Sequence, residues 1–107
     1  MAKSLRKSGP LVQLDDFLIR AKELEYFQGA GETLYEVIGS EEDELIFVAV
    51  KGKRKLQGID LREVYNAYVE LNEFTSNKIG RYVAPRNFAV AKGLLLQCKM
   101  LVYSPAQ

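Results

Sequence analysis

The chain contains no histidine and a single cysteine, Cys98. Histidine is the side chain that most often exchanges protons near neutral pH, so its absence excludes His-based acid–base catalysis. One cysteine excludes a disulfide within the chain, and without histidine it cannot complete a zinc site of the Cys/His type. A large share of enzyme mechanisms is thereby removed.

Long apolar runs and a strong net charge are also lacking. No run approaches the roughly 18 to 20 apolar residues that span a bilayer, so we expect no membrane partner. The basic start of the chain is not followed by an apolar segment, because Asp15 and Asp16 interrupt it, which argues against a signal peptide. With a lone cysteine, this favours a cytoplasmic protein. The formal net charge of +1 excludes nucleic-acid binding by bulk charge alone.

What remains is the composition of one globular domain. The chain has 107 residues, of which 48% are hydrophobic and 27% charged. This is enough for one hydrophobic core without disulfides or structural metal ions. Residues 1–10 are basic and end in Gly9-Pro10, and we expect them to form a flexible N-terminal lead. Residues 11–107 are then a single α+β domain.

The periodicity predicts an N-terminal helix, a three-stranded antiparallel meander, and two further helices packed on the sheet. Apolar residues at spacings of three and four favour helices over 11–24 and 60–73, with Asp60 as a cap for the second. Runs rich in β-branched and aromatic residues predict strands over 33–38, 45–50 and 54–59. The run 45–50 is uninterrupted, which favours a strand buried on both faces.

The last predicted helix, 88–103, is apolar almost all round. A small domain cannot easily surround such a helix by itself, so part of it is expected to be shared with a second subunit. This is the basis for predicting a homodimer.

Basic residues form two groups in the sequence. The first group lies in the second turn and third strand, and the second flanks Tyr82. If the two adjoin, they form a face that can hold the phosphates of a nucleic acid or another polyanion. The structural alternative, which we favour, is an edge strand protected by lysines and a solvated loop. The candidate polyanion-binding residues are Lys51, Lys53, Arg54, Lys55, Lys78, Arg81, Tyr82 and Arg86.

Tyrosines and carboxylates give two weaker signals. Tyr35, Tyr65 and Tyr68 could line a small-molecule pocket, although such residues more often belong to the core. The acidic segment 41–44 matches no EF-hand spacing and is expected to be a solvated turn, so no metal site is predicted.

The leading hypothesis is therefore a small non-catalytic interaction domain that acts as a homodimer without a cofactor. Nucleic-acid or other polyanion binding through the basic face is the alternative. A third hypothesis, to which we give least weight, is an enzyme that uses carboxylates such as Glu36 and Glu63.

Overall fold

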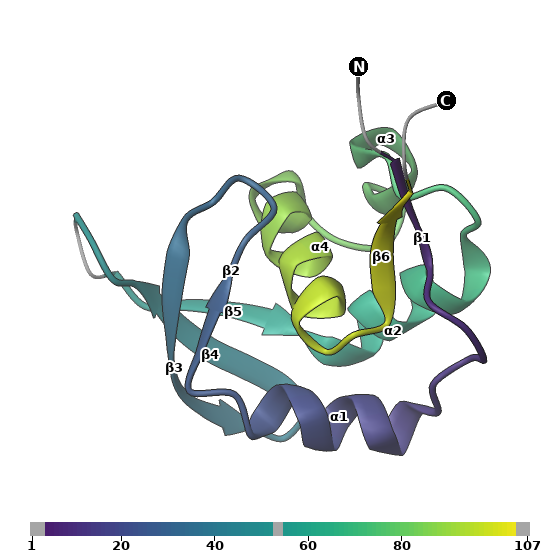
Figure 1. Cartoon of the computed structure of the whole chain (residues 1–107). Helices are drawn as coiled ribbons and strands as arrows, with labels where there is room; N and C mark the ends of the chain where they lie inside the picture. The colour runs from purple at the N-terminus through teal and green to yellow at the C-terminus, as the bar shows by residue number, and fades with distance from the viewer. Residues whose placement is uncertain (1–3, 53–54, 105–107) are drawn as a thin grey trace.

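A computed structural model describes residues 4–52 and 55–104 (Figure 1). Within these residues the chain forms two antiparallel sheets and four α-helices, which confirms the α+β class. The elements in order are β1 (Ser4–Lys7), α1 (Leu14–Lys22), β2 (Tyr26–Gln28), β3 (Leu34–Glu41), β4 (Glu44–Ala49), β5 (Gln57–Asp60), α2 (Leu61–Glu70), α3 (Ser76–Ile79), the 3-10 turn η1 (Pro85–Asn87), α4 (Phe88–Gln97) and β6 (Leu101–Ser104).

The larger sheet has four strands in the order β2-β3-β4-β5, each antiparallel to its neighbour. The prediction of a three-stranded meander was wrong by one strand, because β2 pairs with β3 and adds a fourth strand at that edge of the sheet. β2 has three residues, Tyr26–Gln28, which is too short for strand periodicity to be visible in the sequence. Its conformation is set by pairing, with Tyr26 opposite Glu36 and Gln28 opposite Leu34.

The smaller sheet joins the two ends of the described chain (Figure 1). β1 pairs antiparallel with β6, with Leu5 opposite Tyr103. The amide of Ser8 continues this pairing by donating to the carbonyl of Met100 at 3.0 Å. Residues 4–7 of the predicted lead therefore form a strand, and the first helix follows a strand rather than opening the domain.

Helix α4 ends earlier than the sequence predicts, and its last predicted residues form β6. Lys99 adopts a left-handed backbone conformation, with φ 64°. Its amide donates to Leu96 at 3.0 Å, and the amide of Met100 donates to Leu95 at 2.9 Å. These are the two hydrogen bonds of a Schellman motif, which usually has glycine at the left-handed position. Lysine stands there instead, so the sequence carried no stop signal.

The chain itself covers the apolar surface of α4. Val90, Ala91, Leu94 and Leu95 are each at most 1% exposed. Gly93 allows the backbones of α4 and β2 to approach, because a Cβ at this position would lie 2.3 Å from the carbonyl oxygen of Gln28. The reasoning that linked α4 to a second subunit therefore does not hold.

Helix α2 begins where the sequence predicts. The carboxylate of Asp60 accepts a hydrogen bond from the amide of Arg62 at 2.8 Å, so the expected N-cap is confirmed. No helix in the described part of the chain is long and apolar enough to cross a bilayer.

Candidate interaction surface

The four-stranded sheet has one covered face and one open face. On the covered, inner face, the aromatic rings of Phe27, Tyr35 and Phe47 pack together, with centroids 5.1 to 5.4 Å apart. Leu45 and Ile59 pair across β4 and β5 on the same side, and both are at most 2% exposed. The helices lie on this side of the sheet (Figure 1). Alternate residues of each strand consequently point to the opposite side.

The outer face is also largely apolar, although Glu36 lies on it. The register places Tyr26, Glu36 and Val48 in one row across three strands. Gly39, Ile46 and Gly58 form a second row. A β-bulge between Val37 and Gly39 adds one extra residue, Ile38, beside Ile46. We define the outer face by its apolar residues Tyr26, Leu34, Ile38, Ile46, Val48 and Val50.

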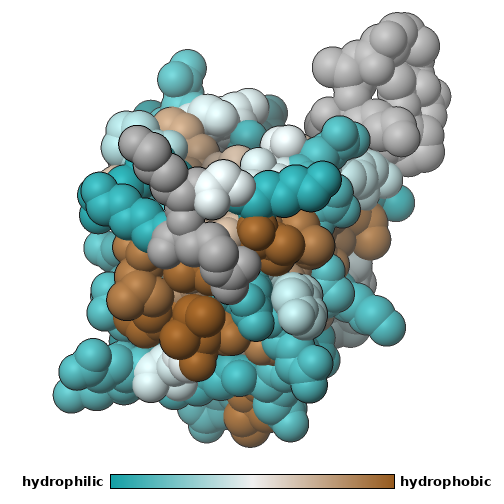
Figure 2. All heavy atoms as spheres, turned by 90° about the vertical axis from the view of Figure 1, so that its left-hand side faces the viewer, coloured by the Kyte–Doolittle hydropathy of each residue, from teal (hydrophilic) through white to brown (hydrophobic). Residues whose placement is uncertain are grey.

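Several outer-face side chains are open to solvent. Ile38 is 54% exposed, Tyr26 50% and Leu34 46%. Leu56, which directly precedes β5, is 64% exposed. Figure 2 views the side of the molecule on which this sheet lies and shows apolar side chains gathered there among hydrophilic ones. Exposed apolar side chains gathered on one face are typical of surfaces that contact other molecules.

The uninterrupted run in β4 explains why the sequence could not distinguish the two faces. Phe47 and Leu45 point inward and are fully buried. Val48 points outward but is only 3% exposed, and Ile46 is half-buried. In the described chain, no helix lies on the outer side of β4 (Figure 1). No residue of the run 45–50 is exposed: the inward side belongs to the core, and the outward side is buried at Val48 and half-buried at Ile46 and Val50.

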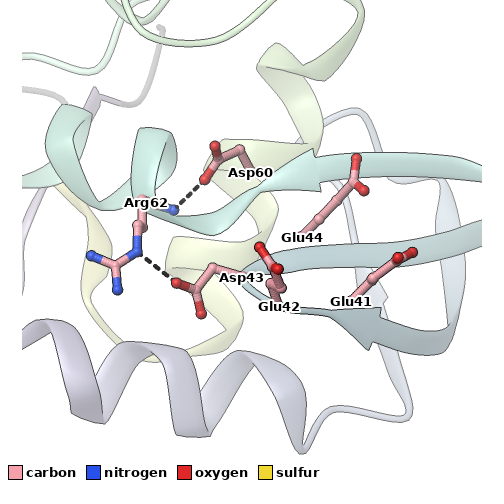
Figure 3. Close-up of a pocket in the computed structure, with 6 residues that line it drawn as sticks. All are labelled: Glu41, Glu42, Asp43, Glu44, Asp60 and Arg62. Atoms are coloured by element: carbon pink, nitrogen blue, oxygen red, sulfur yellow. Dashed lines mark hydrogen bonds and ion pairs between the residues drawn. The ribbon is translucent and has the colours of Figure 1, made fainter.

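An acidic turn closes one end of this face. It joins β3 to β4 and comprises Glu41, Glu42, Asp43 and Glu44, with Asp60 of β5 beside it (Figure 3). The turn is tight because Glu42 adopts φ 55°. The side chain of Glu44 extends over Gly58, where a Cβ would come within 2.5 Å of its carboxylate oxygen. Glycine at 58 therefore makes room for this carboxylate on the outer face.

One carboxylate of the turn is neutralised within the chain. Asp43 accepts from Nε of Arg62 at 2.5 Å and from Nζ of Lys22 at 3.1 Å. The hydrogen bond from Arg62, and then that from Lys22, hold the pKa of Asp43 below its usual value. The same contact raises the pKa of Arg62. Glu41 and Glu44 point away from this cluster (Figure 3).

The sequence predicts that segment 41–44, which contains these carboxylates, is a solvated turn without a metal site. In the described residues no group of three or more Cys, Asp or Glu side chains is arranged to hold a metal ion. What the cluster supplies is an excess of negative charge at one end of the sheet.

The opposite end of the sheet carries the first basic group. Lys51 and Lys55 are exposed in the loop between β4 and β5. Lys53 and Arg54 lie outside the described residues. The sequence nevertheless places four basic residues within positions 51–55.

The second basic group lies elsewhere. Lys78 lies on α3 and forms an ion pair at 3.0 Å with Glu73, which precedes this helix. Arg81 and Arg86 are exposed, and Tyr82 is partly buried against the core. This segment is on the far side of the molecule from the β4–β5 loop (Figure 1). The described residues of the two groups therefore do not form one basic face.

The three candidate pocket tyrosines fall into two clusters. Tyr35 packs on Phe27 and Phe47, as described above. The hydroxyl of Tyr65 donates to the carbonyl of Val12 at 2.8 Å, and the hydroxyl of Tyr68 accepts from the amide of Val12 at 2.9 Å. Tyr65 and Tyr68 thus hold the segment before α1 against α2, and both hydroxyls are used in doing so.

The single thiol is poorly suited to chemistry. Cys98 is 4% exposed, and burial raises its pKa to about 11, with a small opposing effect from the charge of Arg20. The thiolate is the reactive form of cysteine, so this side chain stays protonated and inert near neutral pH.

Comparison of the chain with protein-family models, with curated proteins and with solved structures finds no match. The assignment of a function therefore depends on the geometry described above.

Proposed function

We propose that this protein is a small non-catalytic interaction domain that acts as a homo-oligomer and associates through the outer face of its four-stranded sheet. The observation that carries this proposal is the contrast between the two faces of one sheet. Helices cover the inner face, whereas Ile38, Tyr26 and Leu34 leave about half of their surface exposed on the outer one. Burying such apolar area gains roughly 25 cal/mol per Å².

The catalytic alternative has less support. The chain has no histidine, and its one thiol is held in the protonated form by burial. Of the two carboxylates considered for catalysis, Glu36 lies on β3 in the outer face and Glu63 is exposed on α2. They belong to different elements, a strand and a helix. The cytoplasm stays our proposed compartment, because a buried free thiol suits a reducing environment.

The proposal is tested by sedimentation equilibrium on the whole chain. We expect wild type to associate reversibly and Ile38→Lys to be monomeric at the same concentrations, because a charge would enter the apolar contact. Ile19→Lys is the matched control. Ile19 is 57% exposed on α1 and is not one of the outer-face residues, so its substitution is expected to leave association unchanged.

Three results would contradict the proposal. A wild-type chain that stays monomeric up to millimolar concentration would remove the homo-oligomer. Equal loss of association in Ile38→Lys and Ile19→Lys would move the contact away from the sheet. A monomer retained on a polyanion column in a salt-dependent way, and released by Lys51→Glu with Lys55→Glu, would favour the polyanion alternative instead.

A further inference from the structure

The outer face carries opposite charges at its two ends. Strand β4 has six residues, which at about 3.3 Å per residue separates its ends by about 20 Å. This exceeds the Debye length of about 8 Å at physiological ionic strength. The acidic turn and the β4–β5 loop with Lys51 and Lys55, called the basic loop below, therefore do not neutralise each other within one chain. Each end is left with charge that a second molecule can complement.

Symmetry restricts how two copies can use the same face. Two copies that meet through one self-complementary patch are related by a twofold axis, which here lies in the plane of contact. An axis parallel to the strands places acidic turn against acidic turn and basic loop against basic loop. An axis perpendicular to the strands reverses one copy and places the acidic turn of each against the basic loop of the other.

We infer that two copies of this chain pack sheet against sheet in the second, antiparallel arrangement. The acidic residues Glu41 and Glu44 of each copy face Lys51 and Lys55 of the other, at both ends of a centre that is apolar except for Glu36. An apolar centre with a charged rim is the usual anatomy of a protein interface. This inference rests on the proposed function and adds the orientation of the partner.

The arrangement also gives the basic loop a role. In the dimer, Lys51 and Lys55 contact Glu41 and Glu44 of the partner. Within one chain these carboxylates lie at the opposite end of the sheet from the two lysines. A polyanion would compete for these lysines and so weaken the dimer rather than bind beside it. The acidic turn likewise acts as a contact for the partner and not as a cation site.

Two charge-reversal variants test the orientation. The first is Glu41→Lys with Glu44→Lys, and the second is Lys51→Glu with Lys55→Glu. In the antiparallel dimer each variant alone places like charges together twice, so we expect its dissociation constant at low salt to rise by about tenfold or more. An equimolar mixture of the two variants restores both attractions in the heterodimer. We expect its dissociation constant to return close to that of wild type.

The mixture separates loss of contact from loss of fold, because two misfolded chains would not recover association. Rising salt is expected to weaken the wild-type dimer and to tighten the homodimer of either variant. If the first variant associates as wild type does, and salt tightens wild type, the inference is overturned in favour of the parallel arrangement. In that case the proposed function stands as long as Ile38→Lys still abolishes association. A monomeric wild type overturns both.

Discussion

Helix α4 and the outer face of the sheet are both rich in apolar side chains, but the chain covers the first and leaves the second open. Leu94 and Leu95 of α4 are at most 1% exposed, whereas Ile38 on β3 is 54% exposed. Both segments look alike by composition. The difference arises because the helices pack on one side of the sheet. Apolar composition therefore identifies candidates for burial, and topology decides which of them needs a partner.

The sharpest way to break this comparison is to truncate one side chain on each face. Phe47→Ala removes a fully buried inner ring and is expected to lower the free energy of unfolding by about 4 kcal/mol. Ile38→Ser on the outer face is expected to change it by less than about 0.5 kcal/mol. Urea unfolding checks both at concentrations low enough to keep the chain monomeric. Equal losses would mean that the monomer packs both faces.

The close contact between α4 and β2 gives the next largest effect. Gly93→Ala would place a methyl group 2.3 Å from the carbonyl oxygen of Gln28, which is backbone and cannot rotate away. We expect a loss of about 3 kcal/mol in the free energy of unfolding. Gly31→Ala is the control, because a Cβ there meets no atom within 4 Å and should cost less than about 1 kcal/mol. Similar values for the two variants would show that α4 does not sit directly on β2.

The tyrosine hydroxyls offer a smaller effect and bear on the predicted pocket. Tyr68→Phe leaves the amide of Val12 without its acceptor in a part-buried position. We expect a loss of about 1 to 2 kcal/mol in thermal or urea unfolding. Tyr26→Phe, at a ring that is 50% exposed, should be neutral. If Tyr68→Phe is as stable as wild type, the hydroxyl contributes nothing to stability. That result would leave it available to a ligand and support the pocket hypothesis.

The smallest effect concerns pH. The folded-state pKa of Asp43 lies below the ordinary value of 3.8, so the stability it contributes is fully present above that value. This contribution is lost as the pH falls through the folded pKa. Asp43→Asn is therefore expected to be less stable than wild type at pH 6, with the difference shrinking toward pH 3. Urea unfolding at both pH values measures it, and a difference independent of pH would contradict the role of the Arg62 and Lys22 contacts.

Local patterns predicted the elements whose own residues determine them. The Asp60 cap, helices α1 and α2, and strands β3 and β4 follow from spacing and composition. The pairings were less accessible, because β2 and β1 are three- and four-residue strands formed by partners distant in sequence. The end of α4 was missed because Lys99 occupies a position usually held by glycine.

For the candidate surface too, local features were visible in the sequence, whereas their placement in space was not. Charge in segments 41–44 and 51–55 was visible in the sequence, and so was the apolar run of β4. Their placement at opposite ends of one open face depends on register and on the side chosen by the helices. No periodicity in β4 distinguishes Phe47, which points inward, from Val48, which points outward.

The central claim is that two copies meet through the outer face. The most direct test is an isotope-filtered nuclear Overhauser experiment on a sample mixed from labelled and unlabelled chains. We predict intermolecular contacts to the methyl groups of Ile38 and Ile46, with none to Leu94 of α4. Intermolecular contacts confined to other surfaces, or none in a sample shown to be monomeric at millimolar concentration, would contradict the account.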